Sequence, residues 1–226
     1  MGIFETILKF KYNVSEVFAS VQGEGTRAGK PCFFIRLQGC ELRCKWCDTP
    51  YALDLKERAT ILSGEDLLNK LYSSGIKFVT ITGGEPLNQK AIIPLMTFLC
   101  DKEYEVLLET NGHLDISEVD KRVIKVMDLK CPGSGMEKFN NYKNIEYLDQ
   151  KDEIKFVIKD KKDYEWAKEK IREYELGKRV GAILFSPVWG DLEPKYLAEW
   201  ILQDNLKVRL NLQIHKYIWG PNVRGV

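Results

Sequence analysis

The chain has 226 residues, of which 44% are apolar and 11% aromatic, enough to bury the core of a single domain spanning residues 1–226. Charged residues make up 30% but nearly cancel to a net charge of +1, so neither nucleic acid nor a membrane surface is indicated as partner. No basic head precedes a long apolar run, and no stretch approaches the roughly 20 apolar residues of a membrane span. We therefore expect a cytoplasmic protein whose six cysteines are thiols or metal ligands.

Short apolar runs alternate with amphipathic stretches along the chain. Helices are expected over 64–73, with Ser63 and Asp66 as capping residues, and over 91–100, 164–174 and 194–203, the last opened by Pro194. The alternation predicts a mostly parallel α/β sheet with helices outside it, closed or partly closed as a (β/α) barrel. The expected strands are 32–37, 78–82, 105–109, 123–129, 153–158, 182–186 and 208–214.

Polar or glycine-rich segments follow six of these strands. In parallel α/β folds ligands collect at the carboxyl ends of strands, so we expect the six segments to share one mouth. The alternative is that they are ordinary turns, since glycine, proline, serine and asparagine are common in loops. The segments are 39–40, 82–86, 110–112, 130–134, 186–187 and 215–216.

Three cysteines, Cys40, Cys44 and Cys47, have the spacing C-x3-C-x2-C with no fourth cysteine nearby. Structural zinc sites and electron-carrying iron–sulfur clusters normally use four protein ligands, so three ligands leave one metal position open for chemistry. The alternative is a zinc site completed by Cys131, His113 or His215. Burial as small hydrophobic residues explains the two cysteines in apolar runs, Cys32 and Cys100.

This cysteine motif, with Trp46 before its last cysteine, resembles the signature of the radical S-adenosylmethionine (SAM) superfamily. Gly83-Gly84-Glu85-Pro86 is similar to the superfamily's GGEP motif, whose backbone binds the methionine part of SAM. The resemblance implies a modified, incomplete (β/α) barrel and a [4Fe–4S] cluster held by the three cysteines. The iron without a protein ligand would chelate SAM.

The segment "EVFASVQGEGTRAGKPCFFIRLQGC" resembles the opening of the 7-carboxy-7-deazaguanine synthases, and "TITGGEPL", "LETNG" and "QIHKYIWG" extend the resemblance over most of the chain. Residues 14–49 would form the substrate and cluster segment. The family implies conversion of 6-carboxy-5,6,7,8-tetrahydropterin to 7-carboxy-7-deazaguanine with release of ammonia, in queuosine-type deazapurine biosynthesis.

The resemblance also implies a set of substrate-binding residues. Gln22 and Glu24 carry amide and carboxylate groups suited to the donor and acceptor edge of a pterin. Arg36 lies in an apolar strand and needs an anion; we expect the substrate carboxylate rather than a protein acid, with an internal salt bridge as the rival. The full set is Val21, Gln22, Gly23, Glu24, Arg36, Thr82, His215 and Pro221.

For the cofactors, the resemblance assigns Mg2+ to the hydroxyl of Thr49, an oxygen ligand of the kind that this ion prefers. No residue is assignable as a catalytic acid or base. The residues expected along SAM are Gly83, Gly84, Glu85, Glu109, Asn111, Lys130, Pro132, Ser134, Ser186, Pro187 and Val188.

The expected partners are the small pterin substrate, an electron donor of flavodoxin or ferredoxin type, and a second copy in a homodimer. Two other classes of function stay open. A glycyl-radical-enzyme activase shares the cysteine motif but would act on a protein surface, leaving "QGEG" unexplained. A non-catalytic iron–sulfur or zinc binding module would have no need of the GGEP-like turn.

Overall fold

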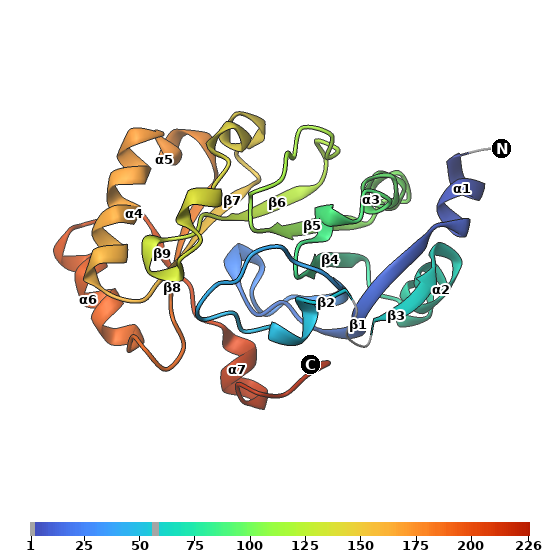
Figure 1. Cartoon of the computed structure of the whole chain (residues 1–226), viewed down its shortest axis with the longest axis horizontal. Helices are drawn as coiled ribbons and strands as arrows, with labels where there is room; N and C mark the ends of the chain where they lie inside the picture. Colours follow the sequence, from blue (N-terminus) through green and yellow to red (C-terminus); the bar gives the residue numbers. More distant parts are fainter. Residues whose placement is uncertain (1–2, 56–58) are drawn as a thin grey trace.

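The computed structural model describes residues 3–55 and 59–226, so residues 1–2 and 56–58 of the predicted domain lie outside the described residues. The strands assemble into one sheet that crosses the molecule (Figure 1). They are β1 (Lys11–Val21), β2 (Pro31–Leu37), β3 (Thr60–Ser63), β4 (Phe78–Gly83), β5 (Glu105–Thr110), β6 (Ile124–Asp128), β7 (Glu153–Ile158), β8 (Ala182–Pro187) and β9 (Arg209–Leu210).

The order of the sheet is β3-β1-β2-β4-β5-β6-β7-β8-β9, and the sheet is open because β3 and β9 form its two edges. From β2 to β9 neighbouring strands run parallel, whereas β1 runs antiparallel to both β2 and β3. The prediction of a mostly parallel α/β sheet that forms an incomplete barrel is confirmed.

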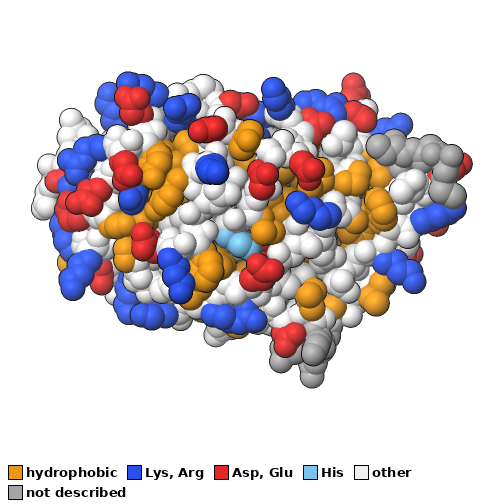
Figure 2. Space-filling model, turned by 45° about the horizontal axis from the view of Figure 1, so that its top comes forward, with side chains coloured by type: hydrophobic (Ala, Val, Ile, Leu, Met, Phe, Trp, Pro, Cys, Tyr) orange, Lys and Arg blue, Asp and Glu red, His pale blue; other side chains and the backbone are white. Residues whose placement is uncertain are grey.

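The helices lie outside the sheet, with α1 to α3 near one end and α4 to α6 near the other (Figure 1). Among residues 3–55 and 59–226, no helix combines the length and hydrophobicity that crossing a bilayer requires. On the face drawn in Figure 2, basic and acidic side chains are interspersed around hydrophobic patches, as the small net charge implies. The helices are α1 (Ile3–Lys9), α2 (Gly64–Ser74), α3 (Ile92–Asp101), α4 (Lys161–Glu173), α5 (Leu176–Arg179), α6 (Pro194–Gln203) and α7 (Ile214–Trp219).

The four predicted helices correspond to α2, α3, α4 and α6, although α4 begins three residues earlier than expected, at Lys161. The predicted cap of α2 is a capping box: Asp66 N donates to Ser63 Oγ at 3.1 Å, and Ser63 N donates to Asp66 Oδ2 at 3.0 Å. Such reciprocal bonds satisfy two backbone donors that the first helical turn leaves unpaired.

The strand predicted over 208–214 is wrong for most of its length, because only Arg209 and Leu210 pair with β8. Beyond them the side chains of Asn211 and Gln213 bind the loop after β1, at Gly25 and Glu24, and α7 begins at Ile214. The long strand β1 was not predicted, since a register irregularity between Val14 and Glu16 interrupts the alternation of buried and exposed residues. The short edge strand β3 was also missed.

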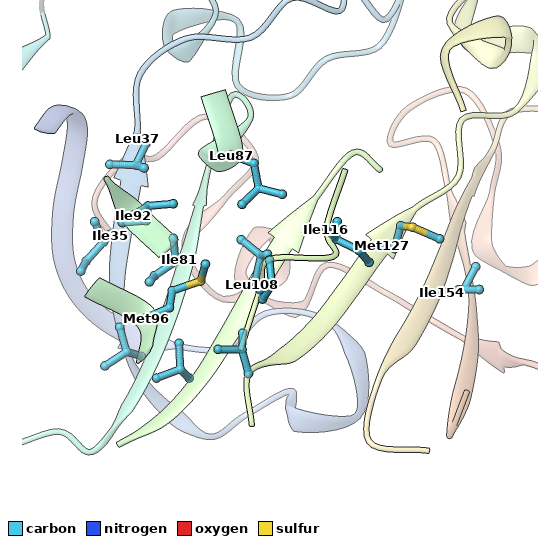
Figure 3. Packing of buried hydrophobic residues seen from close by; sticks show 14 of the residues in the cluster. Ile35, Leu37, Ile81, Leu87, Ile92, Met96, Leu108, Ile116, Met127 and Ile154 are labelled. Carbon is cyan, nitrogen blue, oxygen red and sulfur yellow. The ribbon is translucent and has the colours of Figure 1, made fainter. Parts of the chain in front are cut away.

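The core fills the space between the sheet and its helices (Figure 3). Ile35, Ile81, Leu108, Met127 and Ile154 come from five neighbouring strands, and each is at most 1% exposed. Burying one such side chain contributes roughly 1.5 to 3 kcal/mol relative to leaving it exposed. These alternate residues of each strand point outward to the helices, so the residues between them face the inside of the barrel.

The inward-facing side chains change from apolar to polar along the strands. A small buried cluster, including Phe34, Leu107 and Val126, fills the lower part of the barrel. Two residues further along the same strands stand Arg36, Glu109 and Asp128, and all three line a cavity. The polar end of the barrel therefore lies at the carboxyl ends of the strands, where the sequence predicts a shared mouth.

Candidate active site

A cavity of about 560 Å3 opens at this end of the sheet. It is lined by nearly all of the residues that the sequence assigns to a site, and by residues from each of the six predicted loops. The exceptions are Glu85, Pro132 and Ser134, which do not line it. The alternative that the six loops are unrelated turns is therefore wrong: they converge on one cavity.

The cysteine loop lies across the end of β2. Gly39 N donates to Ala52 O at 2.8 Å and Cys40 N donates to Leu53 O at 3.0 Å, which closes the loop on itself. The buried amide of Gln38 strengthens the closure by donating to two backbone carbonyls of the same loop. The loop thereby places the thiols of Cys40, Cys44 and Cys47 on the cavity wall.

The three thiols have surroundings that suit a shared cluster. Burial raises the pKa of both Cys40 and Cys44, and the amide Nδ2 of Asn111 lies 3.6 Å from Cys40 Sγ, as a donor to sulfur. Cluster binding must overcome this raised pKa, since the ligand is the thiolate. Three cysteines on one cavity wall would hold three irons of a [4Fe–4S] cluster, and the fourth iron would have no protein ligand.

The alternative zinc site finds no support in this arrangement. Among the described residues, no three His, Cys, Asp or Glu side chains converge as ligands of a single ion. Cys131 is 1% exposed and packs in the hydrophobic core, and Cys32 is fully buried. His113 instead bonds Asn111 Oδ1 and Glu41 Oε2, at 2.6 and 2.9 Å.

The GGEP-like turn is built against the cysteine loop. A side chain at Gly83 would collide with the backbone of Leu37, and one at Gly84 would collide with Gly39 O and lie 2.7 Å from Ala52 O. The two glycines therefore permit a close approach of the chain to itself, as well as leaving backbone exposed to the cavity that they line.

Glu85 is fully buried and does not line the cavity. It accepts hydrogen bonds from Leu87 N, Thr110 Oγ1 and Asn111 N at 2.8 to 3.1 Å. Burial raises its pKa, which these donors oppose. The side chain of Glu85 thus joins the GGEP-like turn to the Thr110-Asn111 loop, and its place along the cofactor stays a prediction.

Pro132 and Ser134 do not line the cavity either; they lie in a short 3-10 helix behind it (Pro132–Ser134). Ser134 O accepts a hydrogen bond from Lys45 N at 3.2 Å and so supports the cysteine loop from behind. Lys130 does line the cavity, with its Nζ 3.0 Å from Asp128 Oδ2. Ser186, Pro187 and Val188 line it at the end of β8.

The carboxylate of Glu24 is held by three donors. Lys155 Nζ and Asn211 Nδ2 donate to Oε2 at 3.0 and 3.1 Å, and Gln213 Nε2 donates to Oε1 at 2.9 Å. Burial raises the pKa of this group, but the charge of Lys155 and the hydrogen bonds from Gln213 and Lys155 together lower it overall. Glu24 is thus an ionised acceptor in a fixed orientation on the cavity wall.

A second carboxyl group, Glu109, also lines the cavity, and its pKa is shifted in the opposite direction to that of Glu24. Burial and the charge of Glu24 raise its pKa, against the attraction of Lys155. Thr82 Oγ1 donates to it at 3.0 Å, and the amide of Gln22 lies 3.4 Å away. The cavity therefore offers two carboxyl groups whose pKa values are shifted in opposite directions, beside a buried amide.

Arg36 faces the cavity, but the expectation that no protein acid pairs with it is wrong. Its Nε lies 3.0 Å from Glu16 Oε2, because Glu16 and Arg36 are direct cross-strand partners in β1 and β2. Within the described part of the chain its two terminal nitrogens make no hydrogen bond. They remain available for an anion in the cavity.

His215 packs against Gly23, so closely that a side chain on the glycine would collide with Nδ1. Burial lowers the pKa of this imidazole, so the neutral form is favoured. Val21 and Pro221 line the cavity beside them, and Thr49 Oγ1 lies 4.0 Å from Cys47 Sγ at its wall.

Several wall residues were missed at the level of sequence. Asp128 lies two residues after Val126 in β6, and Lys155 lies two residues after Glu153 in β7. Because side chains alternate along a strand, this spacing could have predicted that both face the inside of the barrel. Asn211 and Gln213 were predicted to lie in a strand. In the structure they lie beyond its end and bind Glu24, which no sequence pattern indicated. Glu16 was read only as part of a family segment.

The comparisons with known proteins agree with this geometry. A family model, the Radical SAM superfamily, matches residues 34–200. The chain is 44% identical over 218 residues to the 7-carboxy-7-deazaguanine synthase of Chlorobaculum tepidum, covering 95% of this chain and 97% of that protein. It is 39% identical over 220 residues to the enzyme of that name from Clostridium acetobutylicum, covering 95% and 99%.

Among solved structures, the fold is similar to the crystal structure of QueE from Escherichia coli, with a TM-score of 0.78 and 26% identity over 94% of this chain and 98% of that one. The three-cysteine loop, the GGEP-like turn and the two cavity carboxyl groups thus occur in a chain whose relatives match it nearly end to end. This protein belongs to the 7-carboxy-7-deazaguanine synthase family of the radical SAM superfamily.

Proposed function

We propose that this protein converts 6-carboxy-5,6,7,8-tetrahydropterin to 7-carboxy-7-deazaguanine with loss of ammonia, in the biosynthesis of queuosine or a related deazapurine. The observation that carries the proposal is that one cavity joins the three cysteines to the Gln22, Glu24 and Arg36 set. Relatives with this activity in their names cover 94% or more of the chain at 39 to 44% identity.

The cofactors would be held at one side of the cavity. Cys40, Cys44 and Cys47 would bind the cluster, and the backbone of Gly83 and Gly84 would contact SAM. When bound, cluster and SAM together supply a radical able to remove a hydrogen atom from the pterin. The protein itself binds, orients and excludes water, which is where its own contribution to the rate lies.

The pterin would be recognised on the opposite side. Glu24 accepts hydrogen bonds and would bind the amino and ring N–H groups, while Gln22 and Thr82 would complete that edge. The terminal nitrogens of Arg36 would bind the 6-carboxylate, with His215 nearby as a neutral imidazole. Glu109, whose pKa is raised by burial and by the charge of Glu24, would contact the cofactor.

Mg2+ is proposed at Thr49, whose hydroxyl lies 3.5 Å from Asp48 Oδ1. Two oxygens from neighbouring side chains suit a hard ion that completes its shell with substrate and water. The ion would neutralise substrate charge during the rearrangement. We further propose a flavodoxin- or ferredoxin-type electron donor and a homodimer working in the cytoplasm, which rest on the family resemblance.

The alternatives are less favoured. A glycyl-radical-enzyme activase must admit a segment of another protein, whereas the charged groups here are gathered inside the cavity around Glu24 and Arg36. A non-catalytic metal-binding module would need neither the GGEP-like turn nor the two carboxyl groups of Glu24 and Glu109 in the cavity.

Anaerobic incubation of the cluster-reconstituted protein with SAM, dithionite, Mg2+ and the carboxytetrahydropterin tests the proposal. We expect 7-carboxy-7-deazaguanine, identified by mass spectrometry, together with ammonia. Cleavage of SAM at the same rate with and without the pterin, and no deazaguanine formed, would refute it.

A further inference from the structure

The carboxylate of Glu16 is shared by two arginines from opposite ends of the chain. Its Oε2 accepts from Arg36 Nε at 3.0 Å and from the hydroxyl of Tyr51 at 2.9 Å. Its Oε1 accepts from Arg224 Nε at 3.1 Å. One negative charge therefore lies between two guanidinium groups at the cavity wall, and Glu16, Arg36, Tyr51 and Arg224 all line that cavity.

The local charge follows from this sharing. Burial raises the pKa of Tyr51 to about 12, with a further contribution from the Glu16 charge, so the phenol stays neutral near pH 7. Within this group of four side chains, two guanidinium groups and one carboxylate sum to one positive charge, whereas Arg36 and Glu16 alone sum to zero. An anionic group on a bound ligand would balance it.

Arg224 is fixed in place although it belongs to the C-terminal tail. Its guanidinium lies 3.7 Å from the centre of the Tyr51 ring, a cation–π contact, while Glu16 binds its Nε. Chain ends are usually poorly ordered unless something ties them down. Every residue from Pro221 to Val226 lines the cavity, so these contacts tie the tail across its mouth, below the loop after β2 in Figure 1.

We propose that Arg224 is a specificity-determining positioning residue, the second arginine of a pair that selects a substrate carboxylate. It engages Glu16 and so leaves the terminal nitrogens of Arg36 free for that carboxylate, with net positive charge to attract it. This inference rests on the proposed function, since it names the substrate group that the pair reads. The rival interpretation is that Arg224 only tethers the tail.

Equilibrium binding without turnover distinguishes a role of Arg224 in specificity from a role as a tether of the tail. The cluster-loaded protein with SAM, kept unreduced, is titrated calorimetrically with 6-carboxy-5,6,7,8-tetrahydropterin and with its 6-carboxamide, which lacks the charge. We expect the wild type to prefer the carboxylate, and Arg224→Ala to lose about tenfold in affinity for it while binding the carboxamide nearly unchanged. Arg224→Lys, which keeps the charge without the planar fork, should fall between them.

Arg122→Ala is the matched control, because it removes an equal charge from a surface ion pair away from the cavity, and both affinities should stay at wild-type values. Equal weakening of both probes in Arg224→Ala, or no change in either, overturns the inference in favour of a tether or of no role. A wild type that binds both probes equally and still forms product overturns it while leaving the proposed function intact. Failure to bind either probe overturns both.

Discussion

Gly23 lies directly beneath the imidazole of His215, and the two segments are also joined by a hydrogen bond from Ile214 N to Gly23 O at 3.0 Å. The glycine thus fixes the distance between the "QGEG" loop and α7. Both residues line the cavity, so a change at Gly23 must move a wall of the site.

Gly23→Ala should therefore displace His215 and weaken pterin binding about tenfold or more, because an added methyl group has no room beside the ring. Cluster absorbance and SAM binding should stay normal. Anaerobic titration with the pterin measures the effect. Gly177→Ala is the matched control, since a Cβ there meets no described atom within 4 Å; unchanged affinity in Gly23→Ala would show that the loop yields easily.

The cluster should depend on three cysteines alone. Alanine at Cys40, Cys44 or Cys47 should abolish the cluster's visible absorbance after reconstitution. Alanine at any of the other three should preserve it, although Cys131→Ala should lower the melting temperature because that thiol is buried in the core. A cluster lost from Cys131→Ala would imply a fourth protein ligand and contradict the open iron position.

Thr49→Ala should bind SAM normally but turn over more slowly and lose its response to added Mg2+, because the hydroxyl is an oxygen ligand of the proposed ion. Thr49→Ser, which retains the hydroxyl, should behave like the wild type. The measurement is turnover against Mg2+ concentration. The same stimulation by Mg2+ in Thr49→Ala would place the ion elsewhere.

Arg36→Lys keeps the charge but offers one nitrogen in place of three, so the side chain cannot bind Glu16 and the substrate carboxylate in the same planar arrangement. We expect the KM for the pterin to rise about tenfold, roughly 1.4 kcal/mol of binding. Cluster content and uncoupled SAM cleavage should be retained. A variant that unfolds or loses its cluster would make Arg36 a structural residue, and His215, which also lines the cavity, would be tested next.

The free energy of unfolding should depend on a buried ion pair between β6 and the residue that precedes β7. Lys125 Nζ lies 3.2 Å from Asp152 Oδ2, and the two side chains are 2% and 0% exposed. Asp152→Ala strands the lysine and should lower the free energy of unfolding by about 3 to 5 kcal/mol. Asp101→Ala, which breaks an exposed pair with Arg122, should cost at most about 1 kcal/mol by denaturant titration. Equal losses would mean that burial of the pair does not matter.

The sequence predicted the parallel strands and the site better than it predicted the chain ends. Runs such as "CFFIRL" and "AILFS" are apolar on both faces, as buried parallel strands require, and the motifs follow directly from their ends. Strand β1 could not be found this way because its pairing is irregular. The partner of Arg36 was missed for the same reason, since Glu16 becomes its neighbour only when β1 is placed beside β2.

The two edges of the sheet are made by its shortest strands, four residues in β3 and two in β9. An exposed edge is where another chain can add a strand, and length is what makes such an addition favourable. A nine-stranded sheet that tapers at both sides therefore offers little template for intermolecular pairing. The long strands that bear the site stay in the interior of the sheet, where both of their edges are already paired and offer no free edge for strand exchange.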